Sequence, residues 1–157
     1  MNVDRERIAK LISSIREAVA LLQELQALSS DEFIGDKHKQ SSAKYNFIAA
    51  IEAAIDLASH LISKRQLRAP EDYADTFQVL AEAGILTDAF GGELKKMARF
   101  RNRLVHRYWD VDAGELWQIL QSRLGDFEKY IAQVGAILAQ EIADNTGTRE
   151  NLSTRHI

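Results

Sequence analysis

The sequence predicts an all-α protein, a five-helix antiparallel bundle, and two observations support this fold class. Apolar residues recur at spacings of three and four through most of the chain, which is the period of an amphipathic helix. Val, Ile and Thr are not grouped in alternating runs, and Pro70 is the single proline of the sequence. The signal for β-strands is therefore nearly absent.

Length and composition favour one globular domain and exclude several function classes. The chain has 157 residues, 46% hydrophobic and 27% charged, and it contains no cysteine. Disulfides, thiolate nucleophiles and zinc sites built on sulfur are therefore excluded. The first ten residues carry charges where a signal peptide needs an apolar stretch, and no uncharged apolar run of about eighteen residues occurs. We expect a cytoplasmic protein that is neither secreted nor membrane-spanning.

The first two helices are predicted from their apolar patterns. A stripe of apolar residues from Ile8 to Leu25 indicates one amphipathic helix, and the stretch SSDEFIGDKHKQS then breaks the pattern. The second helix, from about residue 41 to 64, is apolar around most of its circumference. We expect it to be the central helix, and to need more cover than four neighbours of this size provide, which favours a homodimer.

The third helix is predicted to begin at Pro70, because proline suits the first helical position and Glu71 and Asp72 favour the positive end of the helix dipole. Three of its residues are expected to face inward and Gly84 is expected to end it. The inward residues are Tyr73, Phe77 and Leu80.

The fourth helix is predicted over about residues 87–107, and Asp112 with Glu115 forms a capping pattern for the fifth. The fifth helix carries an apolar stripe as far as Leu138. We expect a helical domain over residues 1–142. Residues 143–157 are predicted to be a polar, flexible tail.

Positive charge is concentrated at the end of the fourth helix, although the whole chain has a net charge of -3. No acid interrupts the stretch between Leu94 and Trp109. Such a cluster attracts a polyanion, but a solvated helix face explains a charge run equally well. Its six basic residues are Lys95, Lys96, Arg99, Arg101, Arg103 and Arg107.

Four residues separate Arg101 from His106 within this cluster, and Asn102 and Tyr108 flank them. On a straight helix, at about 100° per residue, Arg101 and His106 lie about 140° apart, whereas Asn102 and His106 share a face. We therefore expect the helix to fray or bend near His106, or the site to gather groups from two subunits.

The stretch RNRLVHRYWD resembles the arginine-x4-histidine-x-tyrosine signature of the HepT-like branch of the HEPN superfamily. The segments YNFIAAIEAAIDLASHLI and PEDYADTFQVLAEAGIL and the order of five helices are also similar to that family, over roughly residues 3–140. The resemblance implies a dimeric α-helical bundle that acts as a metal-independent ribonuclease toxin. It also implies a partner, a small nucleotidyltransferase antitoxin of the MntA type.

The residue types fit RNA cleavage by attack of a ribose 2′-hydroxyl on the adjacent phosphate. That reaction needs a group that exchanges protons near neutral pH, which the imidazole of His106 provides. Arg101 is expected to stabilise the phosphate through paired hydrogen bonds, and Asn102 to orient the imidazole or the ribose. The other cations, Lys95, Lys96, Arg99, Arg103 and Arg107, are expected to bind RNA. An ordinary helix-end role for His106 is the alternative.

In the family that the motif resembles, the tyrosine at the position of Tyr108 is the residue to which the antitoxin adds AMP. A bulky phosphate beside Arg101 blocks an incoming RNA phosphate by occupying its cationic site. The alternative is a half-buried tyrosine that packs beside Trp109. We expect Trp109 itself to be a packing residue rather than a platform for base stacking.

Two further hypotheses are open at the level of sequence. Glu52, Asp56 and His60 recur every four residues and imitate a metal site, but no Glu-x-x-His pair occurs, so we expect no metal and no cofactor. The competing function is a non-catalytic HEPN module that binds a nucleotide or its nucleotidyltransferase partner. The presence of both Arg101 and His106 favours the enzyme.

Overall fold

The computed structural model describes the backbone of residues 2–154 and the side chains of residues 4–147. Every regular element within this range is helical, which confirms the all-α fold class. There are seven α-helices and one short 3₁₀ helix in this range, rather than five helices. Their bounds are α1 Asn2–Gln26, α2 Ser30–Ile34, α3 Lys37–Lys64, α4 Tyr73–Glu82, α5 Asp88–His106, η1 Tyr108–Asp110, α6 Ala113–Ser122 and α7 Gly125–Thr154.

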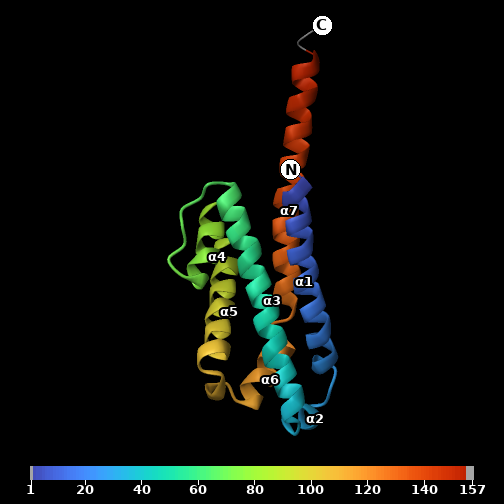
Figure 1. Ribbon diagram of the computed structural model, residues 1–157, viewed down its shortest axis with the longest axis vertical. Coiled ribbons are helices and arrows are strands. Elements are labelled where there is room, and N and C mark those ends of the chain that lie inside the picture. The colour runs from blue at the N-terminus through green and yellow to red at the C-terminus, as the bar shows by residue number, and fades with distance from the viewer. Residues whose placement is uncertain (1, 155–157) are drawn as a thin grey trace.

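Helix α3 is the central helix, as its apolar sequence predicts. It contacts α1, α2, α4, α5 and α6, and α1 and α7 lie on one side of it while α4 and α5 lie on the other (Figure 1). The buried hydroxyl of Tyr130 in α7 also donates to the backbone oxygen of Ala54 at 2.8 Å. Although α3 has the length and hydropathy of a membrane span, these neighbours cover it. These neighbours bury most of its apolar side chains, while Tyr45 near its start stays exposed.

The connection between α1 and α3 contains a short helix that the sequence pattern missed. Ser29 and Glu32 form a reciprocal capping box at the start of α2, and Phe33 is fully buried. Asp36 then caps α3 by accepting from the backbone of His38 and Lys39, so α3 begins at residue 37 rather than near 41.

Helix α4 begins three residues after Pro70, because Asp72 caps it by accepting from the backbone N–H of Asp75. Phe77 and Leu80 are buried as predicted, but Tyr73 is about half exposed. Gly84 follows the helix in the left-handed region, with φ 76°, and confirms the predicted end of this helix.

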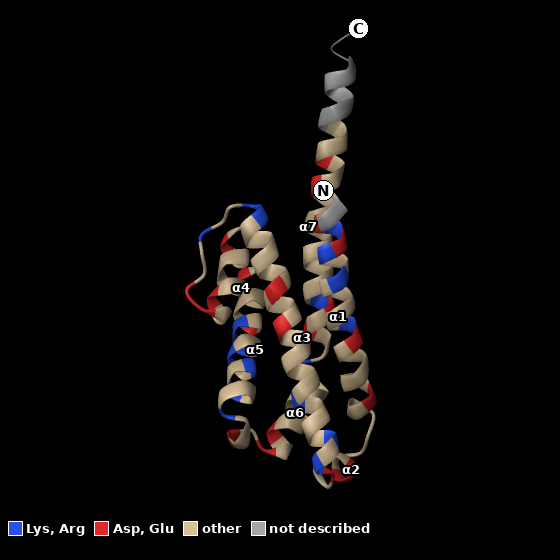
Figure 2. Cartoon of the chain, viewed as in Figure 1, with Lys and Arg blue, Asp and Glu red and all other residues tan. Residues whose placement is uncertain are grey.

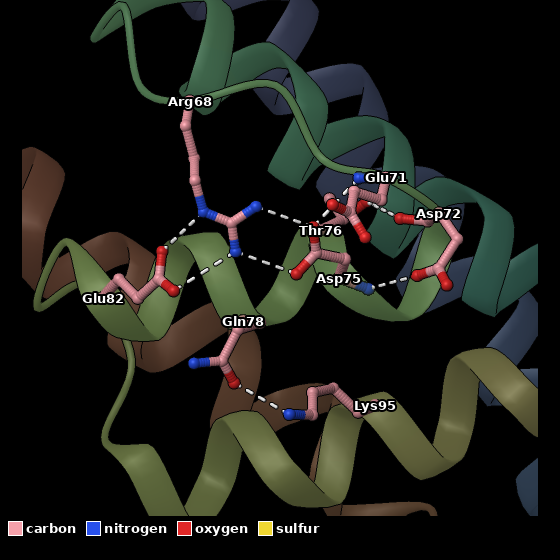
Figure 3. Close-up of polar contacts among 8 residues, drawn as sticks. All are labelled: Arg68, Glu71, Asp72, Asp75, Thr76, Gln78, Glu82 and Lys95. Carbon is pink, nitrogen blue, oxygen red and sulfur yellow. Dashed lines mark hydrogen bonds and ion pairs between the residues drawn. The ribbon is translucent and has the colours of Figure 1, made fainter.

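An arginine fastens the loop between α3 and α4 onto α4 (Figure 3). Arg68 donates to both carboxylate oxygens of Asp75, at 2.7 and 2.9 Å, and to both oxygens of Glu82, at 2.8 and 3.2 Å. The side-chain hydrogen bond from Arg68 lowers the pKa of Asp75 to about 2. Arg68 therefore ties the loop both to the first turn of α4, at Asp75, and to its last residue, Glu82.

The predicted fifth helix is two helices, since the chain turns at Arg123 between α6 and α7. Asp112 caps α6 as predicted, accepting from the backbone N–H of Glu115 at 2.8 Å. Helix α7 continues to Thr154, and its last turns extend past the start of α1 (Figure 1), so residues 143–154 of the expected tail are helical. Residues 155–157 lie outside the described range, and the boundary at residue 142 stays a prediction.

Candidate functional site

The C-terminal end of α5 carries the predicted site. Leu94, Phe100 and Leu104 are buried in the core and fix one side of this helix. The helix ends at His106, because Arg107 leaves the helical conformation with φ -142° and ψ 43°. The helix is thus regular through His106 and ends within the predicted bounds of about 87–107, without a bend that would bring Arg101 and His106 together, and η1 follows at once.

The guanidinium of Arg101 is held by three neighbours. Its Nε and Nη2 donate to one oxygen of Glu52, Oε1, at 3.1 and 2.7 Å, and its Nη1 donates to Oδ1 of Asn102 at 3.1 Å. Its central carbon lies 4.9 Å from the ring centre of Tyr73. The side chain is only 12% exposed, so its orientation is defined by α3, α4 and α5 together.

His106 lies at the exposed end of α5, one turn after Asn102. Within the described part of the chain, its imidazole has no hydrogen-bond or ion-pair partner. The structure thus brings Arg101 and Asn102 together, while no contact joins either of them to His106. The imidazole is open to an external molecule.

Tyr108 and Trp109 form η1 directly after this helix end. Tyr108 is 59% exposed, and its backbone oxygen accepts a hydrogen bond from Nζ of Lys44 at 3.0 Å. The two rings meet edge to face, with their centres 5.7 Å apart. Trp109 is 72% exposed, so the expectation that it is a packing residue is wrong for the single chain: η1 lies on the surface, and within residues 4–147 Tyr108 is the only aromatic ring in contact with Trp109.

Exposed aromatic residues surround the site. Tyr73 faces Arg101, and Tyr108 and Trp109 follow the helix end. Tyr45 is 70% exposed and adjoins Lys44, which contacts Tyr108. Aromatic side chains on a surface are typical of contacts with another macromolecule.

The basic cluster is less positive than its sequence suggests, because acidic residues of α5 itself, of η1 and of α6 lie beside its cations (Figure 2). Four of its cations have partners within the chain, Gln78 for Lys95, Glu93 for Lys96, Glu115 for Arg103 and Asp110 for Arg107. The side-chain hydrogen bonds to Glu115 raise the pKa of Arg103. The three cations that pair with carboxylates attract RNA less than free ones, whereas Gln78 is neutral and leaves the charge of Lys95 in place.

Arg99 alone among the six cations has no such partner in the described part of the chain. It is exposed and lines a cavity of about 370 Å³ between α3, α5, α6 and α7. The floor of this cavity is apolar, with Phe47, Met97 and Phe100 among its residues. Arg99 is therefore the cation of the cluster most available to an anion.

Glu52, Asp56 and His60, whose spacing resembles that of a metal site, do not converge on one point in the structure. Glu52 binds Arg101, while Nε2 of His60 lies 3.8 Å from Asp4. Asp56 lies at the exposed surface of α3, and partial desolvation of its carboxyl by neighbouring atoms raises its pKa. In the described residues, no three His, Asp or Glu side chains form a cluster of ligands.

Sequence reasoning missed the roles of Glu52 and Tyr73 at Arg101. A signal for Glu52 was present, because Glu52 and Asp56 are the only acids in the central, largely buried helix α3. An acid in such a helix is rarely retained without a cationic partner. Nothing in the sequence indicates the position of Tyr73 over Arg101, 28 residues further along the chain, because that contact depends on the packing of α4 against α5.

Comparison with known proteins assigns the family. The profile of the family described as "Ribonuclease HepT-like" matches residues 15–134. The chain is 31% identical to the mRNA nuclease HepT of Shewanella oneidensis over 129 residues, which is 82% of this chain and 96% of that protein. It is 27% identical to the tRNA nuclease HepT of Aphanizomenon flos-aquae over 120 residues, 74% of this chain and 80% of that protein.

A solved structure agrees with these matches. The tri-AMPylated Shewanella oneidensis HEPN toxin, in complex with its MNT antitoxin, superposes with a TM-score of 0.77 at 30% identity. The superposition covers 83% of this chain and 97% of that one. The chain therefore belongs to the HepT-like ribonuclease family, as the motif between Arg101 and Tyr108 led us to expect.

Proposed function

We propose that this protein is a metal-independent endoribonuclease toxin whose site consists of Arg101, Asn102 and His106. Its membership of the HepT-like family supports cleavage of RNA. The observation that carries the proposal is the end of α5, where a fixed guanidinium and an exposed, unpartnered imidazole lie on the same short segment. Because the named relatives act on mRNA and tRNA, either class is a candidate substrate.

In the proposed reaction, His106 takes the proton of a ribose 2′-hydroxyl, whose oxygen then attacks the adjacent phosphorus. The bond to the 5′-oxygen breaks, and that oxygen takes up a proton from water. Arg101 stabilises the additional negative charge on the phosphate oxygens. The products are a 2′,3′-cyclic phosphate and a 5′-hydroxyl end, and no metal ion takes part.

We further propose that two copies of the chain form the working enzyme in the cytoplasm. The exposed residues Tyr45, Tyr108 and Trp109 around the site support a covered surface there. A second copy completes a groove that binds RNA, with Arg99 as its free cation and Lys95, Lys96, Arg103 and Arg107 nearby. The partners of Lys95, Lys96 and Arg107 are surface groups that a phosphate can displace at small cost, whereas both oxygens of Glu115 hold Arg103.

We also propose that Tyr108 accepts AMP from a nucleotidyltransferase antitoxin of the MntA type. The exposure of Tyr108 supports this, as does the AMPylated toxin found in complex with its MNT antitoxin in the similar structure. The added phosphate lies near Lys44 and the end of α5, where it competes with RNA for cationic partners.

The ribonuclease activity is tested by incubating the purified protein with total RNA in the presence of EDTA. We expect cleavage that survives chelation and leaves 2′,3′-cyclic phosphate ends. The variants His106→Ala and Arg101→Ala should be folded but inactive. Intact RNA with the wild-type protein would favour the non-catalytic binding module instead, and loss of cleavage in EDTA alone would contradict the metal-independent mechanism.

The modification is tested by incubation with the candidate nucleotidyltransferase and ATP, followed by intact-mass measurement. We expect the mass of one or more AMP groups on the wild-type chain and none on Tyr108→Phe. Tyr45→Phe is a matched control, because Tyr45 is also an exposed tyrosine near the site. Unchanged addition to Tyr108→Phe would refute the assignment.

A further inference from the structure

We propose that Glu52 is a positioning residue for Arg101, and that it leaves the remaining N–H bonds of Nη1 and Nη2 free to bind the phosphate. This inference rests on the proposed ribonuclease function, since it concerns how the same site holds RNA. It adds a residue from α3, 49 positions before Arg101, to a site that the sequence motif places entirely on α5 and η1.

The argument starts from the donors of Arg101. A guanidinium has five N–H bonds in a fixed planar arrangement. Oε1 of Glu52 accepts one from Nε and one from Nη2, and Oδ1 of Asn102 accepts one from Nη1. Two N–H bonds remain, one on each terminal nitrogen. Because Glu52 occupies the edge formed by Nε and Nη2, a phosphate cannot bind that edge and must use the remaining N–H bonds of Nη1 and Nη2.

The surroundings of Arg101 prevent the guanidinium from turning away from this arrangement. The ring of Tyr73 lies 4.9 Å from its central carbon and covers it from α4. Asp72 caps α4 immediately before Tyr73, and Arg68 fastens the preceding loop to Asp75 (Figure 3). The orientation set by Glu52 is therefore supported by a second fixed element.

Glu52 also changes the electrostatics of the site. Its carboxylate neutralises the guanidinium with which it pairs, so Arg101 offers directed hydrogen bonds rather than net positive charge. Removing the carboxylate raises the net charge of the site by one. The loss of Glu52 should thus leave RNA binding unchanged or tighter while it slows cleavage, a combination that partial unfolding does not produce.

The test compares steady-state RNA cleavage by the wild type with that by Glu52→Ala and Glu52→Gln. We expect Glu52→Ala to lower kcat by roughly 10- to 100-fold without raising KM, because a small misplacement of a catalytic group costs about that much. Glu52→Gln retains an oxygen acceptor and should recover most of the loss. Glu128→Ala is the matched control, because Glu128 pairs with Nε of Arg16 at 3.0 Å on the remote α1–α7 surface.

A second readout does not depend on cleavage. The ¹H–¹⁵N signal of the Arg101 Nε–H group should move in Glu52→Ala and remain near its wild-type position in Glu128→Ala. Wild-type cleavage by Glu52→Ala together with an unmoved signal would overturn the positioning role. Equal loss of kcat in Glu52→Ala and Glu52→Gln would overturn it too, because the charge would then matter rather than the acceptor. If the wild type itself leaves RNA intact, the proposed function fails, and the Arg101 signal still decides the role of Glu52.

Discussion

Among the basic residues of α5, Arg99 is expected to contribute most to the binding of RNA. Among the residues that the structure describes, it is the one cation of the cluster without a partner in the chain, whereas Arg103 is held by both oxygens of Glu115. The informative perturbation is therefore Arg99→Ala, compared with the double variant Arg103→Ala/Glu115→Ala. The double variant removes a cation and its anion together, and so leaves the net charge unchanged.

The size of the effect follows from the release of counterions. Each phosphate of a single strand that a protein neutralises adds about 0.7 to the slope of log K against log salt. Loss of one free cation should therefore lower the slope by about 0.7. Between 50 and 200 mM salt, the fourfold change in concentration then alters the affinity ratio of wild type to Arg99→Ala by about 2.6-fold. The salt slope of the double variant should change little, because Glu115 already neutralises the Arg103 guanidinium in the wild type.

The assay is fluorescence anisotropy with a single-stranded RNA that is 2′-deoxy at the cleavage position, titrated at several salt concentrations. The deoxy position prevents cleavage, so that the binding constants are measured at equilibrium. An equal decrease in slope for Arg99→Ala and for the double variant would refute the reasoning, since ion pairs within the chain would then not determine which cations meet the phosphates.

Three further predictions concern stability. Tyr130→Phe removes a buried hydrogen bond to α3 and should cost about 1 kcal/mol, or a Tm lower by about 2–4 °C. The pKa of Asp75 is about 2, below its usual 3.8, so its ion pair stabilises the fold above pH 4 and is lost as the pH falls towards 2; Asp75→Asn should flatten that part of the pH-stability curve. Gly92→Ala should raise the free energy of unfolding by about 1 kcal/mol, whereas Gly91→Ala should not, because its Cβ would lie 3.0 Å from that of Ala81.

Each of these three predictions has an outcome that contradicts it. Denaturation of Tyr130→Phe at the wild-type midpoint, by urea or by heat, would mean that the hydrogen bond contributes nothing. Unfolding curves of Asp75→Asn that parallel the wild type from pH 4 to pH 2 would contradict the assignment of the low pKa to its arginine partner. Equal stabilisation by Gly91→Ala and Gly92→Ala would show that α4 and α5 are not closely packed at this point.

The elements that could be predicted are those whose causes are local in sequence. The start of α6 at Asp112 and the end of α4 at Gly84 each depend on a residue within a few positions. The missed break near Arg123 lies inside an unbroken apolar stripe, where the residues on both sides of the turn remain buried. Periodicity alone cannot distinguish one long helix from two shorter ones that face the same core.

The partners of the charged residues could not be predicted, because they come from distant parts of the chain. The spacing of Asp112 and Glu115 predicted the start of α6 correctly, since the backbone N–H of Glu115 donates to Asp112. The side chain of Glu115, however, accepts from Arg103 rather than completing a cap. A charged run on a helix also spreads around its axis by about 100° per residue, which separates Arg101 from Arg103.

The same rotation explains why the motif looks complete in the sequence while its parts do not touch in one chain. Arg101 turns towards α3 and Asn102, while His106 lies at the exposed helix end. In the proposed reaction, a scissile phosphate must therefore bridge the gap between the guanidinium and the imidazole, or a second chain must supply the nearer group. Because Glu52 holds the Arg101 guanidinium in a fixed orientation, we expect the His106 imidazole to be the group that changes its position when RNA binds. His106 is the last residue of α5, and the ends of helices fray, which permits that adjustment at little cost.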